Sequence, residues 1–86
     1  MKILYTDEFS KQFRKLPRDI QVLYRRQEGI FRKNWRDPRL HVKKLHGESL
    51  TFSFRVTQVY RVLFLFTETD TALFATIGHR KDVYER

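Results

Sequence analysis

Residues 50–66 of this 86-residue chain read LTFSFRVTQVYRVLFLF and carry its clearest structural pattern. Apolar and polar residues alternate over residues 50–56, which is typical of a strand with one buried face. Residues 59–66 are apolar at nearly every position, which predicts a central strand that is covered on both faces for most of its length. Because only Thr57 and Gln58 separate the two runs, we expect an antiparallel hairpin.

Two helices are predicted upstream of this hairpin. Residues 3–5 form a short apolar strand, and Thr6 is then a suitable N-cap for a helix that Pro17 must end near residue 15 or 16. Residues 18–34 keep a 3.6-residue apolar period, which predicts a second helix. A turn-like connector follows at residues 35–40.

The last long strand is predicted at residues 72–77, after a polar turn. The order is therefore strand, two helices, then strands, which is an α+β pattern. We expect one domain with a short N-terminal strand, a helical hairpin, a three- to four-stranded antiparallel sheet and a short C-terminal turn or helix.

Positive charge dominates the composition. Eighteen Lys and Arg residues against ten Asp and Glu give a net charge of +8. Residues 1–40 hold eleven basic and five acidic residues, so most of the excess lies on the predicted helices. A polyanion is the first partner to consider, and the alternatives are a merely soluble basic surface or an acidic protein.

Without cysteine or a long apolar run, we expect a soluble, cytoplasmic protein with no membrane partner.

Arg61 needs a partner, because it alternates with the apolar Leu63 and Leu65 and a buried, unpaired guanidinium is costly. Arg55 lies across the predicted hairpin, so the two arginines could flank a phosphate. The alternative is a structural salt bridge to one of three acids, Glu68, Asp70 or Asp82.

Three further polar residues follow the last strand. His79 can transfer a proton near neutral pH, Arg80 can offset phosphate charge, and Tyr84 can stack on a base or donate its hydroxyl. Each has a structural alternative: His79 as a strand cap, Arg80 as the partner of Asp82, and Tyr84 as an aromatic lid on the core. Together with Arg61, these residues favour RNA chemistry.

The runs 53–64 (SFRVTQVYRVLF) and 78–84 (GHRKDVY) resemble the RelE/ParE superfamily of toxins from type II toxin-antitoxin systems, and residues 43–47 (KKLHG) fit the same pattern. The resemblance covers nearly the whole chain. This superfamily includes ribosome-dependent mRNA interferases, inhibitors of DNA gyrase and members with no evident toxicity.

For the RelE- and YoeB-like branch, the resemblance implies cleavage of mRNA in the ribosomal A site by attack of a 2′-hydroxyl on the adjacent phosphate. Arg61 and Arg80 would then neutralise the phosphate, Tyr84 would stack on or orient the nucleotide, His79 would lie near the catalytic histidine of some members, and Arg55 would contact the RNA backbone. Both the resemblance and the charge count suggest that ribosomal RNA is bound by four cations on the second helix, Arg25, Arg26, Arg32 and Lys33. The cognate partner would be an antitoxin protein that covers the basic cleft.

One departure from the family pattern concerns the strand positions where RelE carries paired lysines, because these are Thr51 and Ser53 here. We rank His79 first as the proton acceptor. The other candidates are His46 and Glu48. Lys43 or Lys44 would supply additional positive charge, and we expect both lysines to bind RNA. We expect no metal and no cofactor, because the chain lacks the residue spacing of zinc sites and has no glycine-rich phosphate loop.

Two other functions remain as alternatives. One is a gyrase inhibitor of the ParE type, although such members usually lack His and Tyr beside Arg at the chain end. The other is a non-toxic family member that acts as a binding module.

Overall fold

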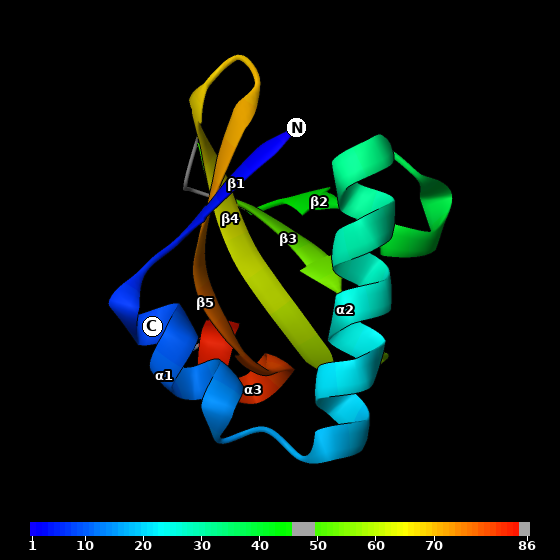
Figure 1. Ribbon diagram of the computed structural model, residues 1–86, viewed down its shortest axis with the longest axis vertical. Coiled ribbons are helices and arrows are strands. Elements are labelled where there is room, and N and C mark those ends of the chain that lie inside the picture. Colours follow the sequence, from blue (N-terminus) through cyan, green and yellow to red (C-terminus); the bar gives the residue numbers. More distant parts are fainter. Residues whose placement is uncertain (46–49, 85–86) are drawn as a thin grey trace.

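The protein, described by a computed structural model over residues 1–45 and 50–84, forms one mixed five-stranded sheet with two helices against one face. Figure 1 shows α1 and α2 flanking the strands and α3 following β5. None of the helices in these two ranges is long and apolar enough to span a membrane. The elements are β1 (Lys2–Tyr5), α1 (Asp7–Arg14), α2 (Arg18–Lys33), the 3₁₀ helix η1 (Pro38–Leu40), β2 (Lys43–Lys44), β3 (Phe52–Arg55), β4 (Tyr60–Glu68), β5 (Thr71–His79) and α3 (Arg80–Tyr84).

The strand order is β1-β5-β4-β3-β2. β1 runs parallel to β5, and every other neighbouring pair is antiparallel. The predicted α+β class and hairpin are confirmed. The strand count lies within the expectation, because β1 precedes the helices and four strands, β2 to β5, follow them. The two lysines of β2 give no apolar signal, so this strand could not be located from the sequence.

The start of α1 is as predicted. Thr6 Oγ1 accepts a hydrogen bond from Phe9 N at 3.0 Å, which satisfies one of the free amides of the first turn. The same hydroxyl donates to Ala75 O on β5 at 2.7 Å. Farther along β5, the Gln12 side chain accepts from Ile77 N at 3.0 Å. Since β1 pairs only as far as Phe74, α1 covers the edge of β5 beyond that point.

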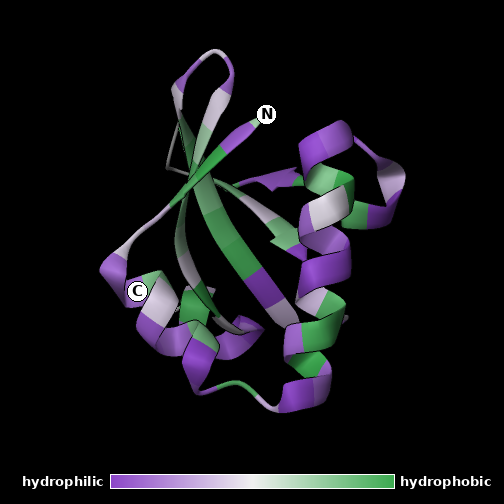
Figure 2. Cartoon of the chain, in the orientation of Figure 1, coloured by the Kyte–Doolittle hydropathy of each residue, from purple (hydrophilic) through white to green (hydrophobic). Residues whose placement is uncertain are grey.

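Phe31 of α2 is the centre of the core and is completely buried. Its ring centroid lies 5.5 Å from Phe54, 5.0 Å from Phe64 and 5.0 Å from Phe74, so one aromatic side chain contacts three strands. Figure 2 shows that β4 is hydrophobic along much of its length, whereas α1 and α2 carry mostly hydrophilic residues. We call the sheet face that receives Phe31 the helix face.

The hairpin register determines which residues occupy the other face. Arg55 pairs with Arg61, and Arg61 pairs with Gly78 on β5. Because directly paired residues share a face and Phe54 lies on the helix face, these positions lie on the opposite side. Ser53 lies on that side too, two residues from Arg55. We call this side the arginine face.

Candidate active site

Three guanidinium groups gather at one end of the arginine face. Burial lowers the pKa of Arg61, Tyr84 opposes this shift, and the positive charges of Arg55 and Arg80 add to it. Arg55 and Arg80 therefore each lie close enough to Arg61 to repel its charge. Within the described residues, none of them forms a salt bridge with a carboxylate. A cluster of positive charge without a protein counter-ion is suited to an anion.

Arg61 itself is tied to the hairpin turn. Its side chain is nearly buried, at 7% exposure, and Nη1 donates to Thr57 O at 2.7 Å and to Gln58 O. Backbone carbonyls, rather than the three acids considered from the sequence, therefore satisfy this guanidinium in the described part of the chain. Arg61 supports the turn, and it is more deeply buried than the neighbouring Arg55.

Tyr84 reaches the same face from α3. Its hydroxyl donates to Ser53 Oγ at 3.0 Å, and Ser53 is only 2% exposed whereas Tyr84 is 44% exposed. The neighbouring Val83 is buried and packs beside Gly78, where its Cγ1 lies 3.5 Å from the position that a Cβ would take. Val83 thus packs α3 against β5, and α3 places the phenol beside the arginines.

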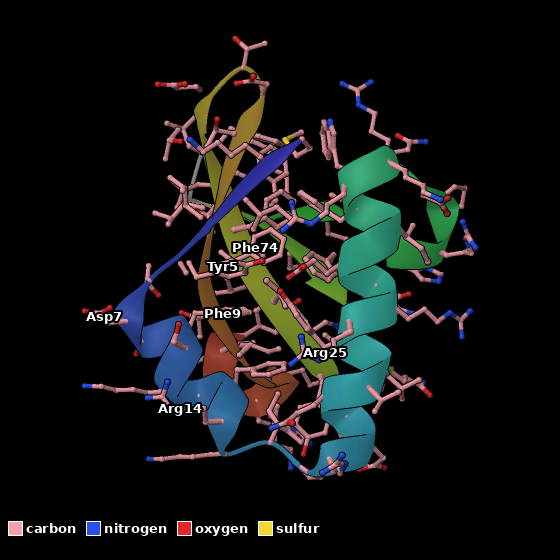
Figure 3. The ribbon with its side chains drawn as sticks, viewed as in Figure 1. Tyr5, Asp7, Phe9, Arg14, Arg25 and Phe74 are labelled. Atoms are coloured by element: carbon pink, nitrogen blue, oxygen red, sulfur yellow. The ribbon has the colours of Figure 1, made fainter. Side chains whose placement is uncertain are left out.

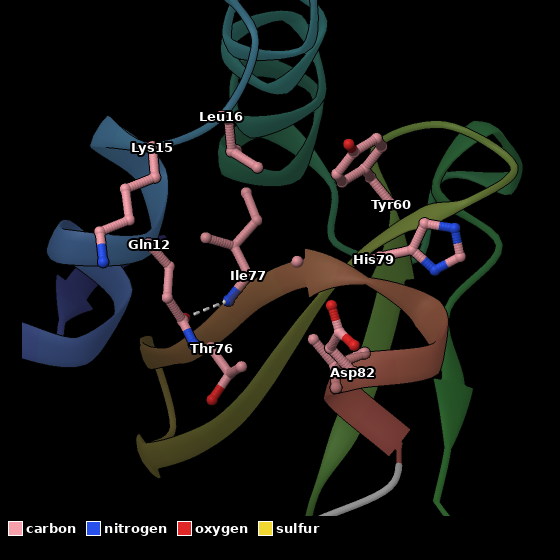
Figure 4. Close-up of a pocket in the computed structure, with 10 residues that line it drawn as sticks. Gln12, Lys15, Leu16, Tyr60, Thr76, Ile77, His79 and Asp82 are labelled. Atoms are coloured by element: carbon pink, nitrogen blue, oxygen red, sulfur yellow. Dashed lines mark hydrogen bonds between the residues drawn. The ribbon is translucent and has the colours of Figure 1, made fainter.

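His79 is directed differently. It pairs with Tyr60 across β4 and β5, one position from the Arg61–Gly78 pair, so strand alternation places it on the helix face. The two rings are 5.9 Å apart, and His79 Nδ1 accepts from Lys81 N at 3.2 Å. Figure 4 shows both residues lining a pocket of about 560 Å³ at the β5 edge. The predicted group of four is therefore divided: Arg61, Arg80 and Tyr84 come together, and His79 lies across the sheet.

The predicted cations of α2 spread along the helix. The Arg25 guanidinium lies 5.3 Å from the centroid of the Phe13 ring, and Figure 3 shows Arg25 between α1 and α2. Arg32 forms a salt bridge with Glu28 at 3.4 Å, which partly offsets its charge. Arg26 and Lys33 are exposed. These side chains are accessible to a large polyanion, and Arg25 also lines a pocket between α1 and α2.

The two lysines of β2 lie on opposite faces. Lys43 pairs with Ser53 and therefore lies on the arginine face, whereas Lys44 pairs with Phe52 and lies on the helix face.

The other candidate proton acceptors, His46 and Glu48, lie outside the described residues. In the sequence, Ser53 was noted only as a position where RelE carries a lysine. Its position two residues before Arg55 was the signal that it shares a face with the arginines.

No family model matches this sequence, and a search of curated proteins also found no match. Solved structures do match. The RelB-RelE antitoxin-toxin complex from Methanococcus jannaschii contains a chain with a TM-score of 0.77 and 23% identity, covering 95% of both chains. YafQ from E. coli strain BL21(DE3) gives a TM-score of 0.78 at 12% identity, covering 96% of this chain and 97% of that one. The YoeB/ParE toxin from Agrobacterium tumefaciens gives 0.77 at 10% identity, covering 93% and 99%.

These similarities extend over almost the whole length of each chain, and the resemblance seen in the sequence is confirmed at the level of the fold. The chain thus has the fold of the RelE/ParE superfamily of toxins.

Proposed function

We propose that this protein is the toxin of a type II toxin-antitoxin system and cleaves mRNA on the ribosome without a metal ion. The observation that carries the proposal is the arginine face, where Arg55, Arg61 and Arg80 have no acidic partner among the described residues and Tyr84 stands beside them. RNA supplies both the negative charge and the aromatic bases that such a site can bind.

In the proposed reaction, the 2′-oxygen forms a bond to phosphorus while the bond from phosphorus to the 5′-oxygen breaks. The products are a 2′,3′-cyclic phosphate and a 5′-hydroxyl, so the net proton transfer is from the 2′-oxygen to the 5′-oxygen. Arg55 and Arg80 would offset the extra negative charge of the pentacoordinate intermediate, with Arg61 behind them. The Tyr84 ring would orient the nucleotide. Arginine remains protonated in proteins and so does not act as the base.

His79 is a weaker candidate for the proton step than it was from the sequence alone, because the sheet lies between its ring and the arginine face. Its bond from Lys81 N supports a role at the start of α3. We therefore place the phosphate on the arginine face and assign contact with ribosomal RNA to the exposed cations of α2.

An antitoxin is the second proposed partner. The RelB-RelE complexes from M. jannaschii and E. coli contain antitoxins bound to toxins of this fold. The basic surface of the present chain would suit an acidic segment laid over the arginine face. Such a segment would block RNA by occupying the same charges. A protein with these two proposed partners would act in the cytoplasm.

The test is expression in cells of the wild type and of a triple variant, Arg61→Ala, Arg80→Ala and Tyr84→Ala, followed by mapping of mRNA 5′ ends. The wild type should create new ends inside reading frames and the triple variant should not. A matched control carries Lys11→Ala and Arg14→Ala, two exposed charges of α1. Growth arrest without new ends would contradict the nuclease, and DNA supercoiling assays would then test the gyrase alternative.

A further inference from the structure

Strand β2 consists of two lysines with opposite environments. Lys43 stands directly opposite Ser53 in the antiparallel register, and Lys44 stands opposite Phe52. Paired side chains across antiparallel strands have Cβ atoms about 4.5–5.5 Å apart on the same face. Lys43 therefore belongs to the arginine face, and its neighbour in the sequence belongs to the helix face.

The residue opposite Lys43, Ser53, is in contact with the candidate site. Ser53 is buried and accepts the hydrogen bond of the Tyr84 hydroxyl at 3.0 Å. Arg55 follows two residues later, about 6.4–6.8 Å along the same side of β3. Positive charge thus continues from Arg80 and Arg61 through Arg55 to the edge strand, with the Tyr84 phenol in the middle.

Among the described residues, Lys43 forms no salt bridge, and its side chain is exposed. A lysine on an edge strand also has a structural explanation, because charge there discourages pairing with other chains. That explanation applies equally to Lys44. It gives no reason why one of the two should line up with Ser53 and Tyr84.

We propose that Lys43 is a substrate-contacting residue of the active site, whose ammonium binds a phosphate of the RNA backbone next to the one held by the arginines. The inference rests on the proposed function and adds a residue and a direction to it: the RNA strand crosses the sheet from α3 towards β2. An ammonium is a compact charge on a flexible stem, so Lys43 can reach a phosphate that the anchored Arg61 cannot. The lysine of this site would thus come from β2 rather than from β3.

The experiment compares Lys43→Ala, Lys44→Ala and Lys2→Ala, three lysines exposed on edge strands. Purified variants are assayed for cleavage of mRNA on programmed ribosomes and for binding of a short single-stranded RNA over a salt series. Lys43→Ala should lower the rate of cleavage by about 10-fold or more. It should also reduce the slope of log affinity against log salt concentration by about 1, the value expected for the loss of one phosphate contact. Lys44→Ala should cost only about 2- to 3-fold, as expected for loss of one distant charge, and Lys2→Ala should match the wild type.

Lys43→Arg keeps the positive charge, whereas Lys43→Gln removes it. The Arg variant should therefore retain more RNA binding than the Gln variant. Equal losses for Lys43→Ala and Lys44→Ala would overturn the inference while leaving the nuclease intact. If the wild type binds RNA without cutting it, the proposed function fails, whereas a selective loss of binding in Lys43→Ala would still support the RNA contact. Thermal unfolding of each variant separates these outcomes from misfolding.

Discussion

The Tyr84 hydroxyl donates a hydrogen bond to Ser53 Oγ at 3.0 Å and so ties the C-terminal helix to the middle of the sheet. Ser53 is 2% exposed, so its oxygen has little access to other donors, while Tyr84 keeps 44% of its surface exposed for a ligand. The relationship fixes the direction of the phenol on the arginine face.

Ser53→Ala should therefore weaken both stability and activity. We expect a loss of about 1 kcal/mol in the free energy of unfolding, the usual net value of one hydrogen bond. Tyr84→Phe removes the same bond from the other side, so a double-mutant cycle measured by urea unfolding should show coupling between the two positions. Additive losses would mean that the bond contributes nothing to the folded state. In the cleavage assay, Ser53→Thr should retain more activity than Ser53→Ala because it keeps the hydroxyl.

Arg61→Ala and Arg55→Ala should separate stability from substrate binding. Arg61 donates to carbonyls of the hairpin turn, so Arg61→Ala leaves those carbonyls without a donor. This should lower the free energy of unfolding by about 1–3 kcal/mol. Arg55→Ala removes a positive charge that acts against Arg61, so its stability should stay close to that of the wild type or rise slightly. Both variants should lose RNA cleavage. Equal unfolding midpoints in urea would show that Arg61 does not support the turn.

The parts of this structure that follow from local periodicity are those that the sequence predicts. Thr6 caps α1 as expected, and the Arg55–Arg61 pair follows from the two strands and the short turn between them. His79 shows where proximity along the chain misleads, because one step along a strand reverses the face. The pairing of Lys43 with Ser53 could not be predicted from the sequence. It depends on the register of β2, a strand with no apolar residue, and only the folded chain shows that register.

Tyr24 should make stability depend on alkaline pH. Burial raises the pKa of this phenol, and its hydrogen bond to Glu28 Oε2 at 2.5 Å acts in the same direction. A raised folded-state pKa means that the contribution is present below the unfolded value of about 10 and is lost as the pH rises above it. The free energy of unfolding should thus fall above pH 10, and ultraviolet absorbance should show Tyr24 ionising only with unfolding. In Tyr24→Phe, that part of the pH dependence should vanish.

Gln27 connects α2 to the end of β3 that carries Arg55. Its side chain is 8% exposed, and Nε2 donates to Arg55 O at 2.8 Å and to Arg39 O at 3.1 Å. Gln27→Glu preserves the shape but replaces the donor with an oxygen that faces two carbonyls, so the variant should lose about 1–3 kcal/mol of unfolding free energy. Gln58→Glu makes the same change at an exposed position and should cost less than about 0.5 kcal/mol. If Gln27 holds Arg55 in place, Gln27→Glu will also weaken RNA binding under conditions in which the protein remains folded. Unchanged affinity at full folding would show that the arginine face does not depend on this anchor.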